Sequence, residues 1–529
     1  MPAAPLSRRQ LLRPDAWATA PSAAAGAWQA RTAAEMPAPD LETLMLSRAG
    51  FGPRPEEVDE ARKLGARAWL EQQIDWQAID DSAVEKALTD MLPTLAMSEA
   101  ELFGVYEDMA RKAYNELRWA SVYRQVFSRR QLHEVMVDFW SDHFSIDHDS
   151  VFCRVLKTVE DRDVIRRHAL GNFKELLTAS SQSPCMLHFL DNDVNTRRKP
   201  NENYGREIME LHTLGVAVEG YPYSEEDVFE VARCFTGWAW TRRNRRVDSN
   251  PDIGKFLYTA GQHDDSAKNV LGNYIPAGLG EQDGHMVIDI LCQHPATATF
   301  LATKLVRRFV TDDPAAEAPE LVQRVADTFT RTEGDIPEML RTIFLSTEFA
   351  ASFATGGGKL TRPMDHVVRA LRAVDVQPAD FGDNDRALSR TFNQLVGGRG
   401  FLAQMDHLPF GWPTPDGYPD TMERWVTTSQ MLARWNYGLA MCGVSQGAQL
   451  ISGFKPERAR PADVDTVGAA VDWWLARLLH REMLAADRQH VVEFLSAGAG
   501  EEAAMAGAVI RREPFAIALI IASPYFQWR

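Results

Sequence analysis

The sequence predicts a mostly α-helical protein. From Asp40 onward, apolar side chains recur at the three- and four-residue spacings of helices, and few runs alternate as β-strands do. The clearest helix covers residues 131–143, where Leu132, Val135, Met136, Phe139 and Trp140 form one apolar stripe. We therefore expect one large helical domain over residues 39–529, or two closely packed helical lobes, with irregular loops and at most a short hairpin.

Composition argues against several classes of protein. The chain has 529 residues, of which 45% are hydrophobic and 25% charged, the balance of a globular protein. Its formal net charge of −16 opposes binding to nucleic acid or to anionic membranes. Its five cysteines stand singly, without a CxxC pair, so neither a zinc ribbon nor a disulfide framework is indicated. No apolar run reaches the roughly 18 residues of a membrane-spanning helix.

The N-terminus is interpreted as an export leader. The segment "LSRRQLLR" at residues 6–13 fits the twin-arginine pattern, and the uncharged, alanine-rich residues 16–30 follow it. Pro14 and Asp15 depart from the pattern. We expect residues 1–38 to be a leader that sends the protein to the periplasm or the medium; the alternative is a disordered leader on a cytoplasmic protein.

The first half of the chain contains separate helices. Glycine and proline divide three short ones, and a longer apolar pattern follows as one helix or two; these lie at residues 41–48, 55–64, 66–74 and 99–127. Next, "PNENYGREIMELHTLGV" at residues 200–216 opens with Pro200 and asparagine caps and ends at Gly215, which predicts a helix of about three turns. Ser224 and Asp227 then form a capping-box pattern before another helix that Gly237 ends.

The second half starts with irregular residues 239–282, which have room for a hairpin, and then returns to helices. These are expected at residues 283–293, 296–312, 318–331, 335–346 and 421–442. The glycine-rich residues 354–363 indicate a hinge between lobes, and the proline-rich residues 406–420 a stiff loop. Trp425 and Trp435 are expected in the core.

Glu207 and Glu210 are the first catalytic candidates. Both lie on one face of the predicted 201–214 helix with Asn203, beside Arg206. A cation near one carboxylate lowers its pKa while burial raises that of the other, which assigns acid and base roles. Asp191 and further polar side chains crowd the approach to this helix. The alternative is a solvated face with ordinary i,i+4 ion pairs.

Aromatic and polar side chains elsewhere suggest a sugar-binding surface. Trp238, His263, Trp412 and Asp416 lie in or beside loops rich in Asp, Asn and Pro, and flat rings beside carboxylates suit a pyranose. His143 and His212 fall on apolar stripes and are expected in the core. No GxSxG pattern occurs, which disfavours serine-hydrolase chemistry, and no GxGxxG or P-loop pattern occurs, which disfavours nucleotide binding. HExxH is also missing; we expect no cofactor and leave any metal ligands unassigned.

Several segments together resemble a known family. They are "LSRAGFGPRPEEV" (46–58), "RRQLHEVMVDFWSDHF" (129–144), "NENYGREIMELHTLGV" (201–216), "YSEEDVFEVARCFTGW" (223–238), "HDDSAKNVLG" (263–272), "FGWPTPDGYPD" (410–420) and "SPYFQWR" (523–529). In this order they are similar to the bacterial family catalogued as domain of unknown function 1800.

The resemblance implies a largely helical protein, often exported and frequently encoded beside a sulfatase-like family, without an established activity. It also places Asp138 within a family motif, which adds that carboxylate to the catalytic candidates. Relatives usually carry asparagine where this chain has Asp142 and alanine where it has Gly205.

The sequence therefore favours an exported hydrolase that acts on a carbohydrate or other polar polymer through an acidic, aromatic cleft. A non-catalytic accessory partner of a sulfatase-like protein is the first alternative. A metal-dependent helical enzyme is the second.

Overall fold

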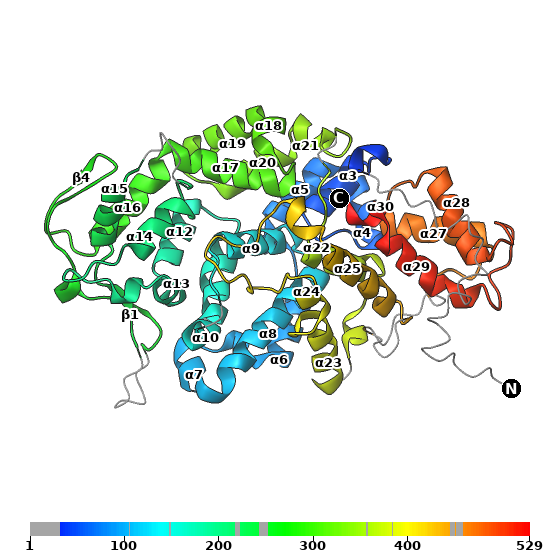
Figure 1. Ribbon diagram of the computed structural model, residues 1–529, viewed down its shortest axis with the longest axis horizontal. Helices are drawn as coiled ribbons and strands as arrows, with labels where there is room; N and C mark the ends of the chain where they lie inside the picture. The colour runs from blue at the N-terminus through cyan, green and yellow to red at the C-terminus, as the bar shows by residue number, and fades with distance from the viewer. Residues whose placement is uncertain are drawn as a thin grey trace.

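The computed structural model describes residues 32–104, 106–147, 150–216, 223–242, 252–355, 358–382, 385–444, 450 and 459–529. Helices make up most of these residues, which confirms the predicted mostly-α class (Figure 1). No helix in this part of the chain has both the length and the apolar character needed to cross a membrane. The predicted leader falls almost wholly outside the described residues.

The helices of the N-terminal quarter agree in large part with the predicted ones. They are α3 (Leu41–Arg48), α4 (Pro55–Leu64), α5 (Ala66–Ile74), α6 (Ser82–Met91), α7 (Glu99–Gly104), α8 (Tyr106–Phe127) and α9 (Gln131–His143). Asp40 caps α3 through its side chain, and Gly65, at φ 81°, separates α4 from α5. The pattern over residues 99–127 is thus two helices, and α9 has its predicted bounds.

The next segment combines helices with two small antiparallel sheets. Its elements are α10 (Val151–Val159), α11 (Arg166–His168), α12 (Phe173–Ser181), α13 (Pro184–Phe189), α14 (Glu202–Glu210), α15 (Glu225–Cys234), β1 (Trp238–Trp240), β2 (Phe256–Tyr258), β3 (Lys268–Val270) and β4 (Asn273–Ile275). β1 pairs with β2 in the register Trp238 to Tyr258, and β3 with β4 in the register Lys268 to Ile275. The described residues thus contain two short hairpin-like pairs where one was expected.

The second half of the described chain is helical. Its helices are α16 (Gln282–Gln293), α17 (Pro295–Phe309), α18 (Pro314–Glu317), α19 (Pro319–Arg331), α20 (Ile336–Phe344), α21 (Thr347–Ala351), α22 (Pro363–Ala373), α23 (Asp385–Val396), α24 (Phe401–Gln404), α25 (Thr428–Met441), α27 (Val467–Leu479), α28 (Ala485–Ser496), α29 (Glu513–Ala522) and α30 (Pro524–Gln527). Residues 406–420 form no helix, as their prolines predict.

One hydrophobic core runs from the N-terminal helices to the last ones. Figure 1 shows α9 and α22 near its centre, with α14–α16 to one side and α27–α29 to the other. Every residue of α22 is buried, and Trp140 of α9 is 1% exposed and donates its indole N–H to the Ala169 carbonyl at 3.0 Å. Residues 359–361, within the predicted hinge, are buried and pair with residues 527–529.

The helix in the 200–216 segment is shorter than predicted. Asn201 caps α14, which ends at Glu210 instead of near Leu214, because the Leu214 amide bonds back to the Met209 carbonyl at 2.7 Å in a wider turn. Gly215 then takes φ 91°. Gly205 lets α15 pack closely: a Cβ there would lie 3.0 Å from both the Ala232 amide nitrogen and the Val228 carbonyl oxygen.

The two tryptophans expected in the core behave differently. Trp425 is buried, whereas Trp435 is 48% exposed, so the prediction for Trp435 was wrong. Tyr437 and Gly438 belong to the buried face of α25, which packs on α29. Trp435 is directed away from that contact, because its position in the helical repeat places it on the other side.

Candidate functional site

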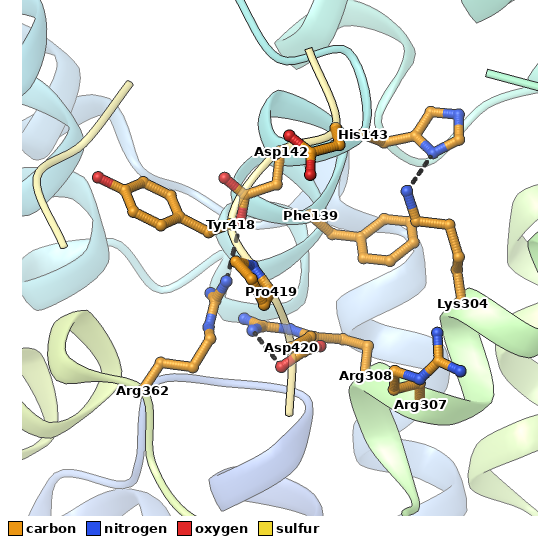
Figure 2. A pocket seen from close by; sticks show the side chains of 12 residues that line it. Phe139, Asp142, His143, Lys304, Arg307, Arg308, Arg362, Tyr418, Pro419 and Asp420 are labelled. Atoms are coloured by element: carbon orange, nitrogen blue, oxygen red, sulfur yellow. Dashed lines mark hydrogen bonds and ion pairs between the residues drawn. The ribbon is translucent and has the colours of Figure 1, made fainter. Parts of the chain in front are cut away.

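A cavity of about 250 Å³ lies where α9, α17, the segment before α22 and the 416–420 loop meet (Figure 2). Its lining combines four cations, three carboxylates, a histidine and several apolar or ring surfaces. The lining residues are Phe139, Asp142, His143, Lys304, Arg307, Arg308, Arg362, Asp416, Gly417, Tyr418, Pro419 and Asp420. Four segments far apart in the sequence thus build one concave, strongly charged surface.

The 416–420 loop is fixed against α9. Gly417, at φ 75°, lies so close that a Cβ would be 2.0 Å from the Asp142 carbonyl oxygen, which only glycine permits. The Tyr418 hydroxyl donates to the Leu408 carbonyl at 3.0 Å, and the Trp425 indole donates to the Pro419 carbonyl at 3.0 Å. The loop is therefore a rigid wall of the cavity.

Buried ion pairs connect the helices that form the cavity wall. The Arg362 guanidinium donates to Asp142 at 2.9 Å and also to Asp138, and Arg308 donates to Asp138 at 3.0 Å. Asp365 lies 2.9 Å from Arg529 and 3.7 Å from Arg308. Because charges removed from water are costly unless paired, this network holds α9, α17 and α22 in fixed relation.

Asp142 is partly protonated near neutral pH. Burial, with the neighbouring Asp138 carboxylate, raises the pKa of Asp142 to about 7, against the opposing effect of Arg362 and Arg308. The Asp142 carboxyl lies in the cavity wall with its side chain 24% exposed. It can therefore donate a proton to a bound molecule.

The pKa of Lys304 is shifted in the opposite direction. Burial lowers the pKa of Lys304 to about 8, and Asp142 partly offsets that effect. Its ammonium group donates to His143 Nδ1 at 2.9 Å, while His143 Nε2 donates to the His212 carbonyl oxygen at 3.1 Å. Burial and Lys304 together hold the pKa of His143 well below its ordinary value, so the ring stays neutral. Lys304 thus has a fixed position and a substantial neutral fraction near pH 8.

The cationic side of the cavity has unused donors. Arg308 is 1% exposed, yet its Nε and Nη1 atoms have no hydrogen-bond partner; Nη1 only approaches Asp420, at 3.7 Å. Arg307 and Lys304 line the same side (Figure 2). Arg308 therefore adds positive charge to this side of the cavity, but its two unpartnered nitrogens are buried beneath the surface.

The chain matches, over residues 44–528, the sequence model of the family described as "Protein of unknown function (DUF1800)". The chain belongs to this DUF1800 family. No curated protein and no solved structure matches it.

Three of the predicted site residues lie at or near the cavity of this DUF1800 protein. Asp138 belongs to the ion network beneath it, and Asp416 lies at the rim. The Trp412 indole donates to Asp416 at 2.8 Å, and the Trp412 ring lies 5.0 Å from that of Tyr418. The aromatic and acidic loop expected from the sequence therefore borders the cavity.

The α14 candidates lie beside the cavity and do not line it. Glu207 and Glu210 are half-buried. Burial raises the pKa of Glu207, with further contributions from Glu210 and from Asp416, so the Glu207 carboxyl lies within electrostatic range of the cavity rim. Arg206 instead donates to Glu225 at 2.9 and 2.6 Å, on an exposed surface.

Polar residues before α14 serve local structure. The Asn203 side chain donates to the Leu190 carbonyl at 3.1 Å, and Asp191 is exposed at φ 58°. Asn192 and Asn195 are buried and bond to the carbonyls of Trp238 and Ala232 at 2.9 and 2.8 Å. The polar density that favoured a functional reading of this segment is thus largely explained by hydrogen bonds that join it to α15 and β1.

Trp238 and His263, expected to bind substrate, lie in the core. Trp238 is fully buried, with its ring 5.1 Å from that of Phe235. His263 bonds to the Thr236 carbonyl at 2.8 Å and to Asp283 at 3.1 Å. Burial leaves neither side chain a surface for a ligand, so the structure gives both a packing role.

Sequence reasoning missed Lys304, Arg308 and Arg362. One signal for Arg308 exists: it falls at i+7 from Leu301 and i+3 from Leu305, on the buried face of α17. A charge on an apolar stripe indicates a buried ion pair. Across the described residues, no group of three or more His, Cys, Asp or Glu side chains is arranged to hold a metal ion.

Proposed function

We propose that this protein is a hydrolase of an anionic polar polymer, with an acidic carbohydrate as the substrate class. The observation that carries the proposal is the pair Asp142 and Lys304, which line one cavity. The pKa of the acid Asp142 is raised toward neutrality and the pKa of the base Lys304 is lowered toward it. Such opposed shifts are typical of groups that exchange protons during catalysis.

In the proposed reaction, protonated Asp142 gives its proton to the oxygen of the bond that breaks. Neutral Lys304 takes a proton from the attacking water, whose oxygen joins the other fragment. The substrate gains one water in total, and Lys304 and Asp142 return to their starting states by proton exchange after product release. With a pKa of about 7, Asp142 is about half protonated at neutral pH, as this role requires.

Substrate recognition would use the cationic side and the rim. A carboxylate or sulfate on the polymer would be attracted by the positive charges of Arg307 and Arg308, which line the same side of the cavity. Trp412 and Tyr418 offer ring faces to a sugar. Export by the twin-arginine route is part of this proposal, because acidic polysaccharides are found outside the cytoplasm.

A non-catalytic partner of a sulfatase-like protein is the second candidate. The exposed surface of α14 and α15 favours it: Arg206 pairs with Glu202 at 3.5 Å and with Glu225 at 2.6 Å in solvent. This is the solvated face that a structural role of α14 predicts.

The test is release of reducing ends from a panel of acidic polysaccharides and their uncharged counterparts. We expect hydrolysis of acidic members only, and losses of about 100-fold or more in D142N and K304M. E207Q and E210Q are the matched controls, since they make the same kind of change beside the cavity, and should lose only a few-fold.

Two outcomes would contradict the proposal. Abolished activity in E207Q or E210Q, together with retained activity in D142N, would place the chemistry on α14. Folded wild-type protein that hydrolyses no member of the panel would favour the partner function.

A further inference from the structure

A second arrangement of polar side chains lies outside the cavity. Ser150 precedes α10, His188 lies in α13 and Asp193 lies in the short helical turn Asn192–Val194. The Ser150 hydroxyl oxygen is 3.0 Å from His188 Nε2, and His188 Nδ1 is 3.0 Å from an Asp193 carboxylate oxygen. A hydroxyl, an imidazole and a carboxylate are thus linked in series.

The other partners of Asp193 fix the direction of the hydrogen bonds. The same carboxylate oxygen accepts from the Trp240 indole at 2.8 Å and from Arg242 at 2.5 Å. Although burial opposes it, hydrogen bonds from His188 and Trp240 keep the pKa of Asp193 below its ordinary value. Because an ionised carboxylate only accepts, His188 Nδ1 carries the hydrogen, and Nε2 is left to accept from the Ser150 hydroxyl. This is the protonation pattern of a nucleophile, its base and the group that orients the base.

Helix capping explains only part of this arrangement. Ser150 caps α10, accepting from the Phe152 amide at 3.2 Å. Ser224 caps α15 in the same way, and its hydroxyl bonds to Asp227 instead of a histidine. A cap needs an acceptor oxygen but no imidazole and no buried carboxylate.

The hydroxyl and the imidazole are accessible, and donors lie nearby. Ser150 is partly exposed and the His188 side chain is 23% exposed, whereas Asp193 is 2% exposed. Amide N–H groups in the first turn of a helix lack intrahelical acceptors. Val151 and Cys153 follow the serine in the first turn of α10, and we assign their amides as the donors that would stabilise an oxyanion at Ser150.

We propose that Ser150 is the nucleophile of a second, esterase site, with His188 as its base and Asp193 as a positioning residue. Ser150 Oγ attacks the carbonyl carbon of a carboxylic ester, and its proton passes to His188 Nε2. His188 gives that proton to the departing alkoxide, which leaves as an alcohol. The acyl group stays bound to Ser150 Oγ. Water then attacks the acyl group, His188 takes its proton and returns it to Ser150 Oγ, and a carboxylic acid is released.

The direct test is labelling of the full chain with a fluorophosphonate, followed by peptide mass spectrometry, together with hydrolysis of p-nitrophenyl acetate. We expect the label on Ser150, and a loss of about 1000-fold in hydrolysis and labelling in S150A. S224A removes the equivalent cap hydroxyl of α15 and should keep both. If S150A fails to fold, the labelled peptide of the wild type still decides the question.

Asp193 is tested by pH dependence. The hydrogen bond that His188 donates to Asp193 raises the pKa of His188, so D193N should move the acid limb of the rate–pH profile to lower pH as well as slow hydrolysis. Folded wild-type protein in which Ser150 is neither labelled nor acylated would overturn the proposal. The same holds if S150A hydrolyses the ester at the wild-type rate. Neither result bears on the Asp142 cavity, whose test uses polysaccharides.

Discussion

Replacing Asp142 with asparagine should change how stability depends on pH. The amide has nearly the shape of the protonated carboxyl, and the family resemblance leads us to expect it at this position, so D142N should fold. In the wild type, burial and Asp138 raise the pKa of Asp142 from 3.8 to about 7. The native state therefore holds a proton that the unfolded chain releases.

The magnitude follows from that difference in pKa. Asp142 stabilises the native state fully below pH 3.8, and this contribution is lost as pH rises through about 7. At 1.36 kcal/mol per pKa unit, the whole effect is about 4 kcal/mol, of which about 2.5 falls between about pH 5 and pH 8. Because the Asp142 side chain is 24% exposed, solvent screening reduces the change in stability between about pH 5 and pH 8 to about 2 kcal/mol.

The assay is urea unfolding of wild type and D142N at both pH values. The stability of D142N relative to wild type should rise by about 2 kcal/mol from about pH 5 to pH 8. D416N changes an exposed carboxylate on the rim of the same cavity and should follow the wild type. A constant difference between D142N and wild type at both pH values would refute the raised pKa and, with it, the acid role of Asp142.

Three further predictions concern packing, Lys304 and export. W140A should lower the free energy of unfolding by about 3 to 5 kcal/mol, because Trp140 is buried and its indole is bonded; unchanged thermal stability would show that α9 is peripheral. Acylation of Lys304, followed by peptide mass spectrometry, should reach half of its maximal rate near pH 8, because burial lowers the pKa of Lys304 to about 8; a rate that still rises about tenfold per pH unit above about pH 9 would show that this pKa is wrong. Residues 1–35 should export a folded reporter, and R8K with R9K should stop it; a reporter that stays inside with the native leader would exclude the signal.

Most helices could be predicted from the sequence because their signals are local. Asp40, Gly65 and Ser224 act within one turn of the ends that they define, so α3, α4, α5 and α15 lie where expected, and an apolar stripe predicts α9. The end of α14 was misplaced, because a wider turn at Leu214 satisfies the same glycine signal at Gly215.

The cavity could be predicted only in part. Asp138, Trp412 and Asp416 were found because they lie in distinctive segments, whereas Lys304 and Arg362 are ordinary surface residue types whose role depends on what they meet. Lys304 meets His143 across 161 positions, and Arg362 meets Asp138 across 224. Periodicity identifies which face of a helix is buried, but not which distant helix will cover it.

The dense polar motif of residues 200–216 acts on the cavity through its backbone. His212 presents its carbonyl oxygen to His143 Nε2, which fixes the hydrogen on that nitrogen and leaves Nδ1 to accept from Lys304. Burial, together with Lys304, lowers the pKa of His212 to about 3, so its ring adds no charge beside the pair. If the turn after α14 shifted, His143 would lose the acceptor that sets its tautomer, and Lys304 would lose its fixed position. The segment that carries the predicted catalytic glutamates thus also holds this histidine and lysine in place.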